Sequence, residues 1–390
     1  MGTIATGSLF LPRLLQGSQL LQQSGNKVLV VLQLSGGNDG LNTVIPVRND
    51  VYYQLRPQIA ISRTESLPLN DEVGLNPHLP FLKTLYDAGD LAILNNVGYE
   101  NPNRSHFRSM DIWQSASQSD QIWDTGWLGR WLDQSMDKHT YDNLAIELDD
   151  TLSLALKGAQ EKALATQNLA RLYNQSRTPY FKAWVEAVQK QHQLDHEKPV
   201  DYLYQTLAST TQQVDFLHQN IRKNTQQTSY PRNALGNRLK QIASLICADV
   251  STKVYYVSVG SFDTHNNQNR RQENLFRQIN AGLESFVQDL KKQHRFEDTL
   301  IFTFSEFGRR VGQNASNGTD HGTANNMFFI SGGLKRKGLL NAMPDLQTLN
   351  EGDLRHTVDF KQVYATLLDK WLNTPHETIL KQAYTSLDFI

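Results

Sequence analysis

Short apolar runs that end at glycine-rich or polar turns constrain the fold of this chain more than any other feature. The strongest is residues 27–34, KVLVVLQL, which the polar turn SGGN follows directly. A continuous apolar run of this length is typical of a strand that is buried on both faces of a parallel sheet. Similar runs recur at residues 91–94, 144–148, 254–259, 300–304 and 327–330.

Helical patterns lie between these runs, at residues 79–88, 105–115, 127–136 and 269–293. Strands that alternate with helices predict an α/β fold with a doubly wound, mostly parallel sheet. The 390 residues are enough for one large α/β domain or for two smaller ones, so length does not decide between these arrangements.

The middle of the chain has a different pattern. From about residue 154 to residue 249 it is rich in Ala, Gln, Leu and Lys, poor in Gly, and apolar residues recur at three- and four-residue spacing. We therefore predict a helical insertion at about 154–249 within an α/β domain that spans residues 27–390. The insertion either forms a lobe beside the sheet or covers one of its faces.

Residues 1–26 are interpreted as a leader or signal remnant. The stretch GSLFLPRLLQ resembles the tail of an export signal, although a basic n-region and a long apolar h-region are missing. A solvated amphipathic leader is the alternative. No run in the chain approaches the roughly 20 apolar residues of a membrane span.

Charge and cysteine usage exclude some function classes. The chain has 38 basic and 39 acidic residues, for a net charge of −1, so composition gives no support for nucleic-acid binding. The single cysteine, Cys247, lies in an apolar helical pattern, so we expect a buried structural role and no intramolecular disulfide. The sequence does not indicate an oligomeric state.

Carboxylates and histidines follow three of the apolar runs. Because parallel strands end at one edge of a sheet, we expect these side chains to share that edge. Aspartate, glutamate and histidine in such positions are typical ligands of divalent metal ions. Taken singly, each is also compatible with an ordinary loop residue. The candidate ligands are Asp39, Asp263, His265, Glu306, Asp320 and His321.

A fourth segment, NPNRSHFRSMD at residues 101–111, precedes a predicted helix. A hydroxyl at a helix N-terminus lies in positive potential, so Ser105 is a candidate nucleophile, with His106 beside it. Arg104 and Arg309 are candidates for gripping an anionic group. The structural alternative is that Ser105 only caps the helix and that His106 is a surface residue.

The motifs LSGGNDGLN, NRSHF, TGWLGR, FDTH, FSEFGR and GTDHG occur in this order. In this respect the chain resembles the bacterial DUF1501 family, which is grouped with the alkaline phosphatase/sulfatase-like superfamily. The resemblance covers about residues 27–372 and implies an alkaline-phosphatase-like fold. Because members of the family are usually exported, it also implies a periplasmic or otherwise exported protein.

The resemblance implies a metal-dependent hydrolase that acts on a small anionic ester, a phosphate or a sulfate. Ser105 matches the nucleophile, and Asp39, Asp263, His265 and His321 match metal ligands, for Zn, Mn, Mg or Ca. One departure stands out: where the superfamily has an Asp-His pair, this chain has Glu306-Phe307, and Phe307 has no ligand atom.

Two alternatives remain open at this point. The first is a non-catalytic exported binding or assembly protein with a degenerate metal site. The second is a metal-free serine hydrolase, for which the characteristic G-x-S-x-G elbow is missing from the sequence.

Overall fold

The computed structural model describes residues 27–135, 145–160, 163–190, 214–215, 217–219 and 228–390. The predicted leader at 1–26 lies outside these residues. So do parts of the predicted insertion, at 161–162, 191–213, 216 and 220–227. None of the described helices combines the length and the apolar character needed to cross a bilayer.

A mixed, mostly parallel sheet forms the centre of the molecule. Its described strands are β1 (Val28–Leu34), β5 (Leu91–Gly98), β6 (Ala145–Glu147), β7 (Leu164–Ala165), β8 (Val254–Val259), β9 (Thr299–Phe304), β10 (Asn325–Ile330), β11 (Gly338–Leu339) and β12 (Val358–Asp359). Their order is β11–β5–β10–β9–β1–β8–β6–β7, and β12 pairs with β5. Only β10 runs antiparallel to its neighbours in this described sheet.

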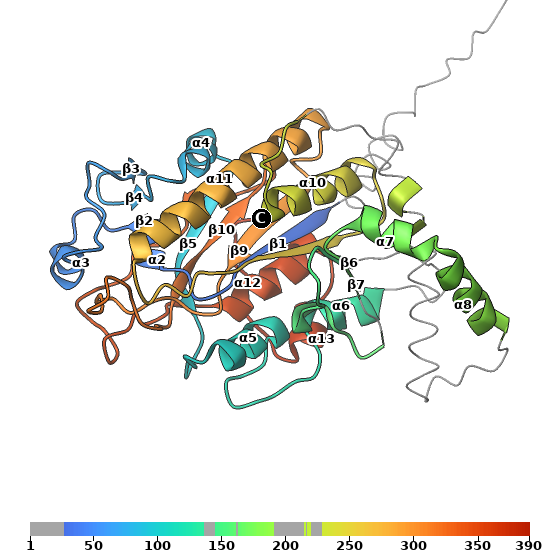
Figure 1. Cartoon of the computed structure of the whole chain (residues 1–390). Coiled ribbons are helices and arrows are strands. Elements are labelled where there is room, and N and C mark those ends of the chain that lie inside the picture. The colour runs from blue at the N-terminus through green and yellow to red at the C-terminus, as the bar shows by residue number, and fades with distance from the viewer. Residues whose placement is uncertain (1–26, 136–144, 161–162, 191–213, 216, 220–227) are drawn as a thin grey trace, which may run out of the picture.

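Helices cover both faces of the sheet, as Figure 1 shows. One face carries α4 (Pro80–Ala88), α10 (Ala234–Cys247) and α11 (Gln268–Lys292), and the other carries α5 (His106–Ser115), α6 (Trp127–Ser135), α12 (Phe360–Thr366) and α13 (His376–Leu380). The predicted doubly wound α/β fold is therefore confirmed.

Smaller elements lie around this framework. A three-stranded sheet contains β2 (Val44–Ile45), β4 (Gly74–Leu75) and β3 (Leu67–Pro68), and near it lie α2 (Gly40–Thr43) and α3 (Asp50–Leu55). The remaining described elements are η1 (Leu154–Leu156), α7 (Leu169–Ser176), α8 (Pro179–Lys190) and the π-helical turn η2 (Leu367–Trp371).

The side chains of β1 alternate between two hydrophobic cores. Val28, Val30 and Leu32 pack on the side of α10 and α11, and Leu29 and Val31 pack on the side of α5 and α12. All seven residues of β1 are buried, as expected for a central strand that is covered on both faces. Complete burial of one such side chain contributes about 1.5–3 kcal/mol, which explains why this run is apolar at every position but Gln33.

Four strands deliver their carboxyl ends to the same edge of the sheet. β1 is parallel to β8 and β9, and two antiparallel steps through β10 make β5 run in the same direction. The segments that leave this edge are 35–39, 260–267, 305–324 and 99–105. In open α/β sheets, ligands bind outside the carboxyl ends of the strands. All of the candidate site residues lie on these segments or at the first residue of α5.

The described part of the predicted insertion, within residues 154–249, includes elements that belong to the sheet and its covering helices. Within 154–249, α10 packs against α11 on the face of the sheet, and the short strand β7 extends the sheet beyond β6. α10 and β7 therefore belong to the main α/β layers, whereas α7 (Leu169–Ser176) and α8 (Pro179–Lys190) lie to the side of the sheet (Figure 1). Cys247, the last residue of α10, is half-buried, and burial raises the pKa of its thiol to about 11.

Candidate metal centre

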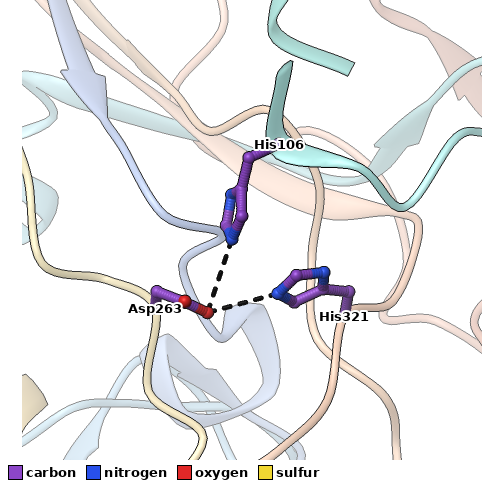
Figure 2. Close-up of side chains that lie close together, drawn as sticks. All are labelled: His106, Asp263 and His321. Carbon is purple, nitrogen blue, oxygen red and sulfur yellow. Dashed lines mark hydrogen bonds and ion pairs between the residues drawn. The ribbon is translucent and has the colours of Figure 1, made fainter. Parts of the chain in front are cut away.

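Three histidines converge on one carboxylate oxygen at the carboxyl edge of the sheet. Oδ1 of Asp263 lies 3.0 Å from Nε2 of His265, 3.2 Å from Nε2 of His321 and 3.5 Å from Nε2 of His106. In Figure 2, His106 and His321 point at Asp263 from two sides. The structure thus brings together Asp263, His265 and His321 from the predicted ligand set and adds His106, which the sequence placed beside the nucleophile.

Nδ1, the other ring nitrogen of each histidine, contacts an oxygen atom of the protein. The three pairs are Nδ1 of His106 with Oε1 of Glu306 at 2.8 Å, Nδ1 of His265 with Oδ1 of Asp320 at 3.2 Å, and Nδ1 of His321 with the backbone oxygen of Arg104 at 2.7 Å. Because carbonyl and carboxylate oxygens accept hydrogen bonds, we assign the ring proton to Nδ1 and a lone pair to Nε2. Metal-ligating histidines are commonly oriented in this way.

The Nε2 atoms have an environment that suits a cation. Those of His265 and His321 lie 3.0 Å apart, and Nε2 of His106 is buried with no hydrogen-bond partner among the described residues. Ligands of a tetrahedral zinc ion lie roughly 3.4 Å from one another, given metal–ligand distances of about 2.1 Å. The ligand atoms of His106, Asp263 and His321 all lie within 4.8 Å of one another. These residues therefore fit a metal ion.

The pKa of Asp263 suits a site for a cation. Burial opposes ionisation of Asp263, but the hydrogen bond and the charge of Arg309 outweigh it and lower the pKa to about 2. The hydrogen bond with Glu306 raises the pKa of His106, and burial lowers the pKa of His321. At neutral pH the centre therefore contains an ionised carboxylate, which is the protonation state that a metal requires.

Arg309 holds the loops of the centre together. Its side chain is fully buried, and its three nitrogens donate to five protein oxygens: the backbone oxygens of Gly36, Gly37, Phe262 and Thr319, and Oδ1 of Asp263 at 2.7 Å. These oxygens come from the loops after β1, β8 and β9. The anion-gripping role predicted for Arg309 is not supported, because its nitrogens are engaged inside the protein.

Two glycines allow the loops to approach closely. A Cβ atom on Gly36 would lie 2.4 Å from the backbone nitrogen of Asp263, and one on Gly37 would lie 2.4 Å from Cε2 of Phe307. Both glycines have positive φ angles, +117° and +77°, a region that side-chain-bearing residues rarely adopt. The SGGN turn after β1 is therefore required for this packing.

Glu306 and Phe307 support the histidines. Oε1 of Glu306 accepts hydrogen bonds from Nδ1 of His106 and from the backbone nitrogen of Gly36, both at 2.8 Å. The buried ring of Phe307 packs against the rings of His106 and His321, with centroids 4.8 Å and 4.7 Å apart. Glu306 thus orients a ligand, which differs from the predicted ligand role, and Phe307 forms an apolar wall.

Asp39, another predicted ligand, contacts backbone and side-chain groups outside the metal centre. It is completely buried and caps the N-terminus of α2, where its Oδ1 accepts from the backbone nitrogens of Leu41 and Asn42. Its Oδ2 pairs with Arg56 at 2.6 Å and accepts from Gln268 at 2.5 Å. Capping of α2 and pairing with Arg56 therefore describe Asp39 better than the predicted ligand role.

Arg104 and Ser105 lie beside the centre. The guanidinium of Arg104 pairs with Asp353, so the predicted anion-gripping role has no support here either. Ser105 occupies the N-cap position of α5, is exposed, and its hydroxyl forms no capping hydrogen bond within this described helix. The predicted capping alternative is therefore wrong for its side chain.

A second group of metal-ligand residue types, Asp369, His376 and Glu377, lies near the C-terminus. Both ring nitrogens of His376 already have partners: Nδ1 lies 2.8 Å from Oδ2 of Asp369, and Nε2 accepts from the backbone nitrogen of Tyr384 at 3.0 Å. Because these contacts are satisfied, we interpret the group as structural.

Known structures that resemble this chain include sulfatases and phosphatase-type hydrolases. The PsFucS1 sulfatase from Pseudoalteromonas sp. is 11% identical, covers 95% of this chain and 72% of its own, and has a TM-score of 0.42. The phosphonate monoester hydrolase SpPMH from Silicibacter pomeroyi is 9% identical, covers 93% of this chain and 78% of its own, and has a TM-score of 0.41. At these values the likeness assigns no activity to this chain.

No curated protein matches the sequence. A family profile does match, over residues 91–383, which is more than half of the chain, and its description is "Protein of unknown function (DUF1501)". The matched part contains His106, Asp263, His265 and His321. The chain therefore belongs to the DUF1501 family.

Proposed function

We propose that this protein is a metal-dependent hydrolase of phosphate or sulfate esters, with one divalent ion held by His106, Asp263 and His321 and with His265 beside them. The observation that carries the proposal is the convergence of three Nε2 atoms on Oδ1 of Asp263. The class of substrate follows from the motif resemblance described above.

The ligand set favours zinc over the other ions. Imidazole nitrogen suits Zn²⁺ and related transition metals, whereas Mg²⁺ and Ca²⁺ prefer sites built from oxygen atoms. One ion is proposed because Asp39 and Glu306 are engaged in other contacts. A bound divalent ion would supply Lewis-acid stabilisation of the oxygens of a transferring phosphoryl or sulfuryl group.

Ser105 is the proposed nucleophile. Ser105 is exposed and lies in sequence between Arg104, whose carbonyl oxygen contacts His321, and His106 itself. The N-terminus of α5 also offers positive potential to an anionic group. In the proposed reaction the Ser105 oxygen bonds to phosphorus or sulfur and loses its proton to solvent, while the ester oxygen leaves and takes a proton from water. Attack by water then releases phosphate or sulfate and restores the hydroxyl.

The test is a screen of aryl phosphates and aryl sulfates with zinc-loaded protein, compared with Ser105→Ala. Ser316→Ala, which changes an exposed serine in the 305–324 loop, is the matched control. We expect hydrolysis by the wild-type and Ser316→Ala proteins and its loss in Ser105→Ala. Equal activity in Ser105→Ala would reject the nucleophile. Zinc binding without hydrolysis of any substrate would favour the non-catalytic binding protein instead.

A further inference from the structure

The turn at residues 350–353 lies outside the strand-end loops in sequence, yet it contacts Arg104, which lies beside the centre. The backbone nitrogen and oxygen of Asn350 each form a 2.9 Å hydrogen bond with the backbone of Asp353. The two residues between them, Glu351 and Gly352, have φ angles of +53° and +86°. Two successive positive φ angles are the signature of a tight type I′ turn, and a non-glycine residue there carries backbone strain.

This turn places a buried carboxylate against Arg104. The side chain of Asp353 is 1% exposed, and its Oδ2 accepts a hydrogen bond from Nη2 of Arg104. Oε2 of Glu351 lies 4.0 Å from the same nitrogen, and Nε of Arg310 lies 3.9 Å from Oδ1 of Asp353. The Asp353 contact is thus the direct one, and the other two are longer ion pairs at the rim.

The same turn supports His321 from two directions. The backbone oxygen of Arg104 lies 2.7 Å from Nδ1 of His321. On the other side, the hydroxyl of Thr323, two residues after His321, donates to the backbone oxygen of Leu354 at 2.5 Å. The 350–354 segment therefore fixes both the oxygen that orients the ring and the chain that carries it.

We propose that Asp353 is a positioning residue: through Arg104, it holds the carbonyl oxygen that keeps the proton of His321 on Nδ1 and leaves Nε2 facing Asp263. The inference rests on the proposed metal centre but concerns the geometry of the protein itself. Outer partners of metal-ligating histidines typically contribute about 10–100-fold to metal affinity.

The experiment compares Asp353→Asn with Glu351→Gln, a matched loss of one carboxylate charge in the same turn. Ring-nitrogen NMR shifts of ¹⁵N-histidine-labelled protein without metal report the tautomer of His321, and calorimetric titration with Zn²⁺ reports affinity. We expect Asp353→Asn to reduce the Nδ1–H tautomer and to weaken zinc binding about 10-fold. Glu351→Gln should leave both measurements unchanged.

The double variant Asp353→Asn with Arg104→Gln removes both charges of the direct pair, so neither partner of that pair is left charged without the other, and it serves if the single variant does not fold. It should show the same loss of the Nδ1–H tautomer. An unchanged tautomer and an unchanged zinc affinity in folded Asp353→Asn or in the double variant would overturn the proposal. If the wild-type protein binds no zinc, the metal proposal fails, while the tautomer measurement still decides the role of Asp353.

Discussion

The Nε2 atoms of His265 and His321 lie 3.0 Å apart, while each ring contacts an oxygen through Nδ1 on its other side. With the ring protons on Nδ1, two nitrogen lone pairs face each other beside the carboxylate of Asp263. Such an arrangement is electrostatically unfavourable without a shared proton or a metal ion between the acceptors. This relationship is the physical basis of the proposed centre.

Replacement of Asp263 should weaken zinc binding more than replacement of Asp320, because Asp263 is a proposed ligand and Asp320 contacts only the far side of a histidine ring. Asp263→Asn removes the charge on which the three Nε2 atoms converge, so zinc affinity should fall by more than about 100-fold, the upper range for outer partners. Asp320→Asn, which changes only the partner of Nδ1 of His265, should cost about 10-fold. Calorimetric titration at neutral pH measures both affinities, and equal losses in the two variants would contradict the assignment.

Gly37→Ala should destabilise the protein strongly. The new Cβ would lie 2.4 Å from the ring of Phe307, which is packed between two histidines, at a backbone φ of +77°. We expect a loss of more than about 2 kcal/mol in the free energy of unfolding, from the left-handed backbone and the clash together.

Gly260→Ala is the control for this experiment, because a Cβ there would meet no described atom within 4 Å. Its free energy of unfolding should stay within about 0.5 kcal/mol of the wild-type value. Urea denaturation compares the two variants. A Gly37→Ala protein as stable as Gly260→Ala would mean that the loops are not packed as described.

Much of the fold was predictable from the sequence, because strands that are buried on both faces are mostly apolar. The runs at 254–259 and 300–304 correspond to β8 and β9 almost residue for residue. β7 was not predicted, since two residues carry too little pattern. The run at 91–94 marks only the first half of β5, whose second half contains Asn95 and Asn96.

Because the predicted run covered only residues 91–94, the sequence did not show where the segment that leads to His106 begins. His106 was therefore not recognised as a ligand. With β5 ending at Gly98, the segment 99–105 leaves the same edge as the other loops, and His106 joins the centre. Asp39 and Glu306 lie at this edge as predicted, but sequence position does not show which partner a carboxylate takes. Arg56 and Gln268, which engage Asp39, are distant in sequence and belong to no motif.

Arg309→Lys should loosen the whole centre. A lysine cannot reproduce five contacts from three nitrogens, so several buried backbone oxygens would lose their donor. We expect a loss of more than about 3 kcal/mol in the free energy of unfolding. The neighbouring change Arg310→Lys, at a partly exposed side chain, should cost less than about 0.5 kcal/mol. Similar losses in both variants would argue against a central role for Arg309.

The buried carboxyl of Glu147 should make the free energy of unfolding depend on pH, independently of the metal centre. Burial raises the pKa of its carboxyl from 4.5 to about 7. Between these values the folded protein binds a proton that the unfolded chain has released, so stability falls as pH rises through this window. Above pH 7 the full penalty applies, about 3 kcal/mol.

Glu147→Gln removes the titration while an amide oxygen can still accept from the backbone nitrogen of Ser153, which lies 2.7 Å from the carboxylate. The variant should therefore be more stable than the wild type at pH 8 and lose that advantage towards pH 5. Denaturant unfolding at the two pH values provides the comparison. A wild-type protein that gains stability from pH 5 to pH 8 relative to Glu147→Gln would contradict this sign.

The metal content of the purified protein tests the central claim most directly. After zinc loading and exhaustive dialysis, elemental analysis should find one zinc ion per chain in the wild type and in His78→Ala, which changes a histidine outside the centre. His321→Ala should retain none. A wild-type protein that holds no divalent metal after loading, or a His321→Ala protein that holds as much zinc as the wild type, would contradict the account.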